Sequence, residues 1–300
     1  MYCSKRCRIV AATKASEGWP LLKIRLWAIP MTCCLAFGMP AIADDKSGFT
    51  FLNPTPDAGL RSFSTDRPPK ANSPYTVDAG HFQYETDLVV YGYGNTAGLR
   101  TDQWTVLDPT LKLGLTNSID AEVQLTPYES NATRGALGST SASGVGDTVA
   151  RLKVNLLGND SGPVSLALLP YVKVPTAPQS LGNRALEGGL ILPIAVTAPG
   201  GFTVVFMPEG DYLKNSPADG YHTVFDFLIN VSHPLDKRWT LFSEIYTAQP
   251  LKTGYSRVFT LDEALTCLLR PSIQLDFGGN FALNSVTPRI QLYAGLSQRF

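Results

Sequence analysis

Residues 147–156 read Asp-Thr-Val-Ala-Arg-Leu-Lys-Val-Asn-Leu, and their pattern indicates the fold class of the protein. Apolar and polar side chains alternate along it. Leu152 and Val154 fall on one parity, and Arg151 and Lys153 fall on the other. Side chains of a β-strand point alternately to its two faces, so the segment has one apolar and one polar face. A strand of about ten residues with this pattern is the unit of a transmembrane β-barrel.

The same alternation recurs from Gly80 to the end of the chain, in segments separated by turn residues. It predicts an all-β protein, an antiparallel up-and-down transmembrane β-barrel of about twelve strands. Glu263 falls on the apolar face of the tenth segment, which is among the least regular. The strands are expected at residues 82–90, 107–116, 121–126, 147–156, 163–174, 187–197, 202–212, 222–232, 239–247, 258–269, 273–284 and 289–300.

The connections between these segments alternate in length. In outer-membrane barrels, tight turns lie on the periplasmic side and long loops on the outer side, and an even strand count places both termini in the periplasm. Short turns are expected at 117–118, 157–162, 199–201, 234–238 and 270–272, and longer loops at 92–102, 129–146, 175–186, 213–221 and 247–257. Aromatic residues near the segment ends fit the interfacial girdles of such barrels. They are Tyr91, Tyr93, Trp104, Tyr128, Phe202, Tyr212, Tyr221 and Trp239.

A secretory signal peptide is predicted at residues 1–43. A basic segment ends at Arg25, an apolar run follows to about Phe37, and Ala41-Ile-Ala43 has the pattern of a cleavage site. Cleavage is expected after Ala43. The apolar run is shorter than the ~20 residues that a membrane-spanning helix requires.

The charge and the cysteines change once this leader is removed. The whole chain has 25 basic and 25 acidic residues, but only 19 of the basic and 24 of the acidic ones follow Ala43. The zero net charge of the whole chain argues against a general nucleic-acid binder. Four of the five cysteines lie in the leader, and Cys267 alone remains. It can form neither an internal disulfide nor a cysteine metal site, and neither cofactor nor metal is expected.

Residues 44–76 differ from the rest of the chain. They are rich in Pro, Ser and Asp and show no sustained alternation. They are interpreted either as a loose periplasmic extension or as a partial plug that folds back into the barrel. Their low hydrophobicity favours the extension. The chain is therefore divided into a signal peptide (1–43), an irregular periplasmic N-terminal segment (44–76) and an outer-membrane barrel (77–300).

If the apolar faces contact lipid, the polar side chains must face the barrel interior. Twelve strands lie between about eight, where side chains fill the interior, and the 16–18 that leave an open channel. A narrow and partly obstructed pore is therefore expected. The candidate pore-lining residues are Glu85, Asp108, Lys112, Glu122, Asp147, Arg151, Lys153, Lys173, Asp226, Glu244, Asp276 and Arg289.

These charges are unevenly distributed. Arg151, Lys153 and Lys173 belong to neighbouring segments, whereas the inward charges of the seventh to eleventh segments are acidic. Two interpretations remain open. Opposite signs on facing walls would create a field that screens solutes by charge and dipole. Alternatively, the charges pair with one another and stabilise the barrel.

Several stretches, in matching order, resemble the family known as the putative MetA-pathway of phenol degradation, which consists of outer-membrane barrels described as transporters. They are residues 63–68, 79–85, 144–147, 150–154, 274–278 and 295–300. The resemblance implies an outer-membrane barrel, with aromatic or other hydrophobic compounds as solutes. The amphipathic last strand ending at Phe300 also resembles the signal by which the barrel-assembly machinery recognises its clients. Outer-membrane lipid is the other expected partner.

The expected function is passive passage of small solutes across the outer membrane. The alternative is a structural or adhesive barrel whose interior is filled by side chains and transports nothing. A hydrolase is disfavoured, since only His81, His222 and His233 could serve as a base. His222 and Asp226 share a parity but lie roughly 13 Å apart at ~3.3 Å per residue. No catalytic residue is predicted.

Overall fold

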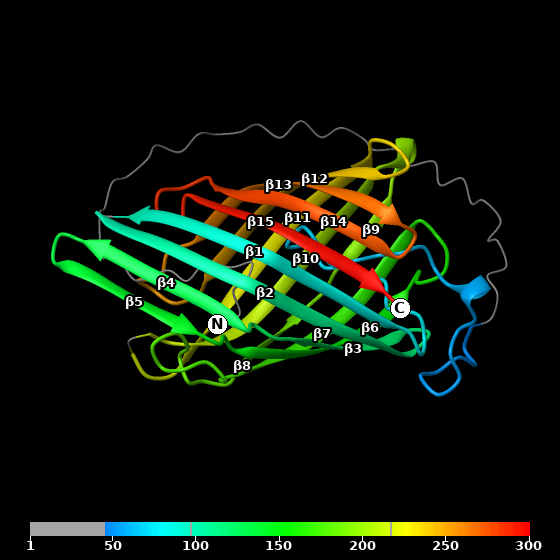
Figure 1. Ribbon diagram of the computed structural model, residues 1–300, viewed down its shortest axis with the longest axis horizontal. Helices are drawn as coiled ribbons and strands as arrows, with labels where there is room; N and C mark the ends of the chain where they lie inside the picture. The colour runs from blue at the N-terminus through cyan, green and yellow to red at the C-terminus, as the bar shows by residue number, and fades with distance from the viewer. Residues whose placement is uncertain (1–45, 97, 217) are drawn as a thin grey trace.

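The strands of the chain form one closed sheet. The computed structural model describes residues 46–96, 98–216 and 218–300, so the predicted leader lies outside the described residues. Neighbouring strands pair antiparallel, and β1 (Phe82–Thr96) pairs with both β2 (Leu99–Thr116) and β15 (Ile290–Arg299). The sheet therefore closes on itself as a barrel (Figure 1).

Fifteen strand segments make up twelve barrel strands, because three of the barrel strands are interrupted. β3 (Ile119–Gln124) and β4 (Tyr128–Gly135) both pair with β2 and flank Pro127, which has no amide hydrogen to donate. β8 (Glu187–Ile191) and β9 (Ile194–Thr197) flank Pro193 in the same way and lie between the same two neighbours, β7 and β10. The prediction of twelve strands is confirmed.

The third interrupted strand consists of β5 (Gly138–Gly144) and β6 (Thr148–Leu157), which pair with β4 and β3 respectively. Among the described residues, no helix has the length and apolar character needed to cross a bilayer. The remaining elements are β7 (Val164–Val174), β10 (Thr203–Lys214), β11 (Tyr221–Pro234), β12 (Trp239–Pro250), β13 (Val258–Arg270), β14 (Ile273–Ala282) and the short 3₁₀ turns η1 (Asp57–Gly59) and η2 (Pro199–Gly201).

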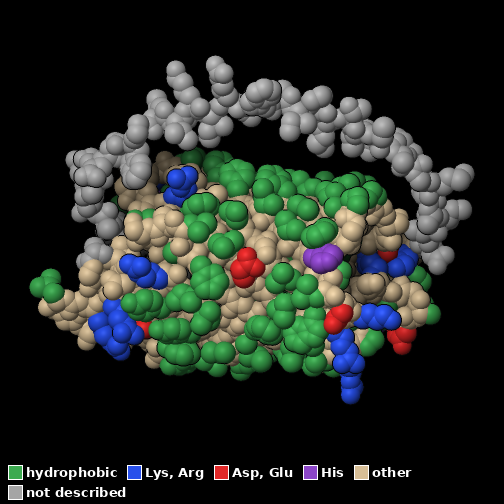
Figure 2. Space-filling model, turned by 90° about the horizontal axis from the view of Figure 1, so that it is seen from above, with side chains coloured by type: hydrophobic (Ala, Val, Ile, Leu, Met, Phe, Trp, Pro, Cys, Tyr) green, Lys and Arg blue, Asp and Glu red, His purple; other side chains and the backbone are tan. Residues whose placement is uncertain are grey.

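The barrel exterior is apolar. Leu152 on β6 is 39% exposed and Leu292 on β15 is 45% exposed, and both side chains point away from the interior. Figure 2 shows apolar side chains covering much of one face of the barrel. The outward Glu263 accepts a hydrogen bond of 2.8 Å from Ser243, its pairing partner on β12. An apolar belt of this kind is the surface that a transmembrane barrel presents to lipid.

The first strand, β1, departs from the predicted alternation. The registers of β1 against β15 and β2 skip Leu88, so that Asp87 and Val89 pair with consecutive residues of β15. Such a bulge inserts one residue and reverses the parity beyond it. Strict alternation along the predicted strand 82–90 would place Val90 on the outer apolar face with Leu88, but Val90 is buried and only 3% exposed. The prediction for Val90 is wrong because sequence alternation alone does not show where a bulge lies.

Two of the segments predicted as loops belong to strands. Most of residues 92–102 belongs to β1 and β2, which pair up to their turn. Residues 129–146 are largely the hairpin of β4 and β5, in which Gly135 pairs with Gly138. Figure 1 shows this hairpin extending beyond the barrel at the end opposite the C-terminus. Its residues are polar on both faces, which is compatible with strand pairing outside lipid but not with the alternation used to predict strands.

The residues before β1 enter the barrel. Residues 64–79, here called the interior segment, include a fully buried run at 66–71 and a second one at 76–79. Their partners lie on strands all around the barrel, as described below. The favoured prediction of a loose extension is therefore wrong for residues 64–76. Low hydrophobicity does not prevent their burial, because the barrel interior is itself charged and polar.

Candidate functional site: a charged barrel interior

The interior segment carries charges of both signs into the barrel. Asp66, Arg67 and Lys70 are 7%, 5% and 7% exposed. A buried charge is costly unless it is paired and hydrogen-bonded. The three side chains meet this condition in three different places on the wall.

Asp66 binds the basic part of the wall. The Lys153 ammonium lies 2.9 and 3.0 Å from the two Asp66 carboxylate oxygens, and Lys112 pairs with the same group. Lys112 is also paired with Glu85 at 2.6 Å, and Lys153 with Glu122 at 3.2 Å. The Asp66 amide in turn donates to Glu85 at 3.0 Å. These residues form one network between the interior segment and strands β1, β2, β3 and β6.

Arg67 binds the neighbouring acidic part of the wall. Its Nη1 lies 2.6 Å from the Asp87 carboxylate on β1. Its Nε and Nη2 donate to the two carboxylate oxygens of Asp276 on β14, at 3.1 and 2.6 Å. Gly295 of β15 pairs with both acidic residues and lies between them. The guanidinium is thus held by two carboxylates over a glycine.

Lys70 reaches the next part of the acidic wall. Its ammonium pairs with Asp262 and donates to the Thr260 hydroxyl at 3.3 Å, both on β13. The backbone amides of Lys70 and Ala71 donate to the Glu244 carboxylate at 3.1 and 3.0 Å. Irregular backbone inside a barrel needs such partners, since it has no strand to pair with.

Lys173 and Arg151 have partners on the wall itself. Lys173 is fully buried and pairs with Asp147 at 2.7 Å and Glu187 at 3.1 Å. Arg151 lies 3.7 Å from Glu122. The candidate pore residues Lys112, Lys153, Lys173, Glu244 and Asp276 therefore all contact an opposite charge or a backbone amide.

Two further candidates occupy different positions. Asp108 accepts hydrogen bonds from Gln124 at 2.8 Å and Thr126 at 2.6 Å, and it is buried. Arg289 is exposed in the turn that precedes β15. It lies just before the start of the strand at Ile290, which fits a position at the rim of the barrel, and its place along a pore stays a prediction.

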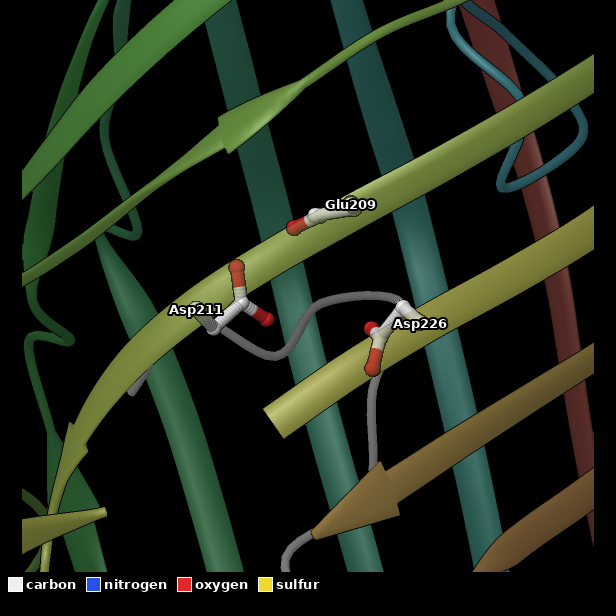
Figure 3. A group of neighbouring side chains, drawn as sticks. All are labelled: Glu209, Asp211 and Asp226. Atoms are coloured by element: carbon white, nitrogen blue, oxygen red, sulfur yellow. The ribbon is translucent and has the colours of Figure 1, made fainter. Parts of the chain in front are cut away.

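Three buried carboxylates lie together on β10 and β11, namely Glu209, Asp211 and Asp226 (Figure 3). Their nearest carboxylate oxygens are within 4.8 Å of one another. The hydroxyls of Tyr171 and Tyr246 donate to Asp211 at 2.6 Å and Asp226 at 2.7 Å. Carboxylate oxygens are the ligands that hard cations such as Ca²⁺ prefer. This is the one group of described residues whose geometry could hold a metal ion.

An apolar patch in the interior was not predicted from the sequence. Ala71 of the interior segment contacts a cluster of buried apolar side chains on the wall. The only signal in the sequence is the occasional apolar residue on the polar parity, such as Leu169 and Tyr171 on β7. The cluster consists of Val149, Ala167, Leu169, Tyr171, Ile191, Met207, Val224, Leu228, Tyr246 and Ala248.

The seam between the first and last strands also holds the chain before β1. The imidazole of His81 lies 3.0 Å from the Phe300 carbonyl oxygen and 2.8 Å from the Thr55 carbonyl oxygen. The Phe300 amide donates to the Phe82 carbonyl at 2.8 Å, and the two phenyl rings lie 5.9 Å apart. The described N-terminal residues and the C-terminus are therefore at the same end of the barrel.

Several solved structures have a similar fold. An outer membrane channel from Pseudomonas putida F1 shares 15% sequence identity over 73% of this chain and 94% of that chain, with a TM-score of 0.51. The NanC porin shares 10% identity over 72% of this chain and 98% of that one, with a TM-score of 0.46. The CymD monoaromatic hydrocarbon channel shares 8% identity over 73% and 87%, with a TM-score of 0.43. At 15% identity, the likeness to the Pseudomonas channel concerns the fold alone.

A more specific relationship comes from the sequence. No curated protein matches the chain closely enough to be counted as a relative. The family model described as "Putative MetA-pathway of phenol degradation" matches residues 65–300. This range includes the charged residues of the interior segment and every strand of the barrel. The protein therefore belongs to the family of the putative MetA-pathway of phenol degradation.

Proposed function

We propose that the protein is an outer-membrane channel for the passive passage of small solutes. The observation that carries this proposal is a closed barrel with an apolar exterior and a charged interior, occupied by a segment of the same chain that no strand pairing holds. Side-chain ion pairs and single hydrogen bonds hold residues 66–71 in place. Passage requires this segment to move from the barrel interior.

Small aromatic or other hydrophobic compounds are the proposed solutes. The family description connects its members with phenol degradation. The apolar cluster around Leu169 and Met207 supplies a surface inside the barrel against which such a compound could pack. It lies against Ala71, so displacement of the interior segment would expose it to an entering solute.

The proposed location is the outer membrane of a Gram-negative bacterium, reached by export and cleavage after Ala43. The described fold supports this location, because a closed barrel leaves no unpaired strand edge in lipid. The last strand, β15, and its terminal Phe300 are the proposed recognition element for the barrel-assembly machinery. We propose a role in transport and none in catalysis, in keeping with the description of the Pseudomonas relative as a channel.

A second candidate function is a structural or adhesive barrel that transports nothing. The observation in its favour is that the interior segment, with Asp66 and Arg67, fills part of the interior with well-paired charges. In that case the β4–β5 hairpin would be the functional surface. The two candidates differ in whether the interior ever opens.

Liposome swelling distinguishes them. The mature chain is refolded into liposomes, which are then diluted into isotonic solutions of sugars or small phenols. A channel gives solute-dependent swelling, with faster swelling for the phenols than for the sugars after subtraction of protein-free liposomes. Intact folding without swelling, for the original chain and for Arg67→Ala and Lys70→Ala together, would establish the filled barrel.

A further inference from the structure

We propose that Asp87, Gly295 and Asp276 form a binding site for a guanidinium group. In the described state the site is filled by Arg67. When the interior segment leaves, it binds a small guanidinium or amidinium cation from solution. That second step rests on the proposed channel function, whereas the existence of the site does not.

The site is built by the register of three neighbouring strands. Asp87 on β1 and Asp276 on β14 are both direct pairing partners of Gly295 on β15. The three residues therefore form a row across the sheet, with a carboxylate at each end. Strand pairing fixes the backbone of all three, so the site remains in the wall when the interior segment moves. Both carboxylates are buried, at 3% and 2% exposed.

Glycine provides the space between the two carboxylates. A Cβ built at Gly295 would overlap Nε, Cζ and Nη2 of Arg67. Any other residue would push the guanidinium out of the row. The backbone at this position has no positive φ that would itself require glycine. Glycine is therefore needed at position 295 because the Arg67 guanidinium occupies the space where a side chain would lie.

The contacts suit a guanidinium better than an ammonium. Nε and Nη2 bind the two oxygens of Asp276 in parallel, and Nη1 points to Asp87 at 2.6 Å. Paired donors in a fixed plane are a property of guanidinium and amidinium groups, whereas an ammonium is a point charge. Lys70 provides the comparison in the same barrel, since its ammonium has one carboxylate, Asp262, and one hydroxyl, Thr260.

A cation from solution would replace Arg67 for an electrostatic reason. Leaving two buried carboxylates without a counter-charge is strongly unfavourable. Buried carboxylates also outnumber buried lysines among the described strand residues, so the interior attracts cations in general. The geometry of the two carboxylates additionally favours planar cations.

The test uses the mature full-length chain in detergent, with methylguanidinium chloride as the probe and methylammonium chloride at equal ionic strength as the control. Arg67→Ala removes the resident guanidinium from the site. Calorimetry should show methylguanidinium binding to this variant at least about tenfold more tightly than methylammonium. Adding Asp87→Asn and Asp276→Asn should abolish that binding. Lys70→Ala keeps Arg67 in place and should give no binding.

Folding of each variant is checked by heat-modifiable migration on gels. If Arg67→Ala does not fold, the original chain in planar bilayers gives a second measurement. Millimolar methylguanidinium should compete with Arg67 and raise the open probability, whereas methylammonium should not. Equal binding of the two cations in calorimetry, or equal effects of the two cations on the open probability of a conducting channel, would overturn the proposal. Selective binding in calorimetry by a protein that never conducts would retain the site and reject the channel.

Discussion

Arg67 and Asp276 lie 209 residues apart in the chain and form a two-point ion pair inside the barrel. Asp276 belongs to β14 and Arg67 precedes β1, so the pair spans nearly the whole length of the barrel sequence. It can form only when the last strands have been added to the sheet. The interior segment therefore reaches its final position late in folding.

Arg67→Ala is expected to raise the open probability of the channel. Removing one partner of a buried ion pair costs about 3–5 kcal/mol, since the other charge remains buried. The substitution destabilises the state in which the interior segment is bound inside the barrel, so the segment should leave the interior more often. The measurement is single-channel recording in planar bilayers. The matched control is Arg134→Ala, because the Arg134 side chain is 60% exposed and lies 3.8 Å from Asp102. Unchanged open probability in Arg67→Ala would contradict a gating role for the segment.

Asp66 and Lys153 are expected to be energetically coupled. Asp66→Asn and Lys153→Met should each destabilise the folded protein, and the double variant should lose less than the sum. A coupling free energy of about 0.5–3 kcal/mol is typical of residues in one network. Urea unfolding in lipid vesicles, followed by tryptophan fluorescence, gives the four free energies of unfolding. If the losses in free energy of unfolding were strictly additive, the ion pair between Asp66 and Lys153 would contribute nothing to holding the interior segment.

Gly295→Ala is expected to raise the open probability of the channel, as Arg67→Ala does. The new methyl group would overlap the Arg67 guanidinium and displace it from Asp87 and Asp276. Gly210→Ala is the control, because a Cβ there would meet Phe225 at an ordinary contact distance of 3.7 Å. A Gly295→Ala channel that stays as closed as the original would mean that the wall accommodates a methyl group beside Arg67.

Leu152→Arg is expected to destabilise the membrane-inserted barrel. An arginine facing lipid costs about 2–4 kcal/mol near the bilayer midplane and little near the interface. The free energy of unfolding from lipid vesicles reports the loss. Leu137→Arg is the control, since Leu137 is fully exposed in the turn between β4 and β5. Equal costs at the two positions would argue against lipid contact by the Leu152 face.

The contacts around Asp160 should weaken in acid. Burial opposes ionisation of this carboxyl, but hydrogen bonds from Asn117 and Lys46 and the charge of Arg61 outweigh burial and lower its pKa. A lowered pKa contributes stability that is complete above the unfolded value of about 3.9 and is lost as the pH falls further. A spin label at Ser62→Cys, with Cys267→Ser, should be immobile at pH 7 and gain mobility progressively as the pH falls below about 3.9. In Asp160→Asn the label should be mobile over the whole pH range.

The barrel strands could be predicted because lipid and water impose opposite requirements on the two faces of each strand. Leu152 and Lys153 show this directly, one facing outward and the other buried beside Asp66. The bulge at Leu88 could not be predicted, since an inserted apolar residue looks like any other in an apolar segment. The hairpin of β4 and β5 was missed because its residues are polar on both faces and show no alternation.

For the interior segment, the partial plug was the less favoured of two interpretations, and the reason is different. Its composition indicates that it has no apolar core of its own, and Asp66, Arg67 and Lys70 look like solvated charges. Their partners of opposite charge, Lys112, Asp276 and Asp262, lie on barrel strands that are distant in the sequence. Such complementarity depends on which strands close the barrel, and a single sequence does not supply that information.

The hairpin of β4 and β5 has a practical consequence. Among the named strands, β5 pairs only with β4, and the Leu137 side chain at their turn is fully exposed. Figure 1 places this tip beyond the barrel rim, away from the interior segment. A short peptide epitope inserted at the tip would be displayed to antibodies on intact cells, and its detection there would report which way the barrel is oriented.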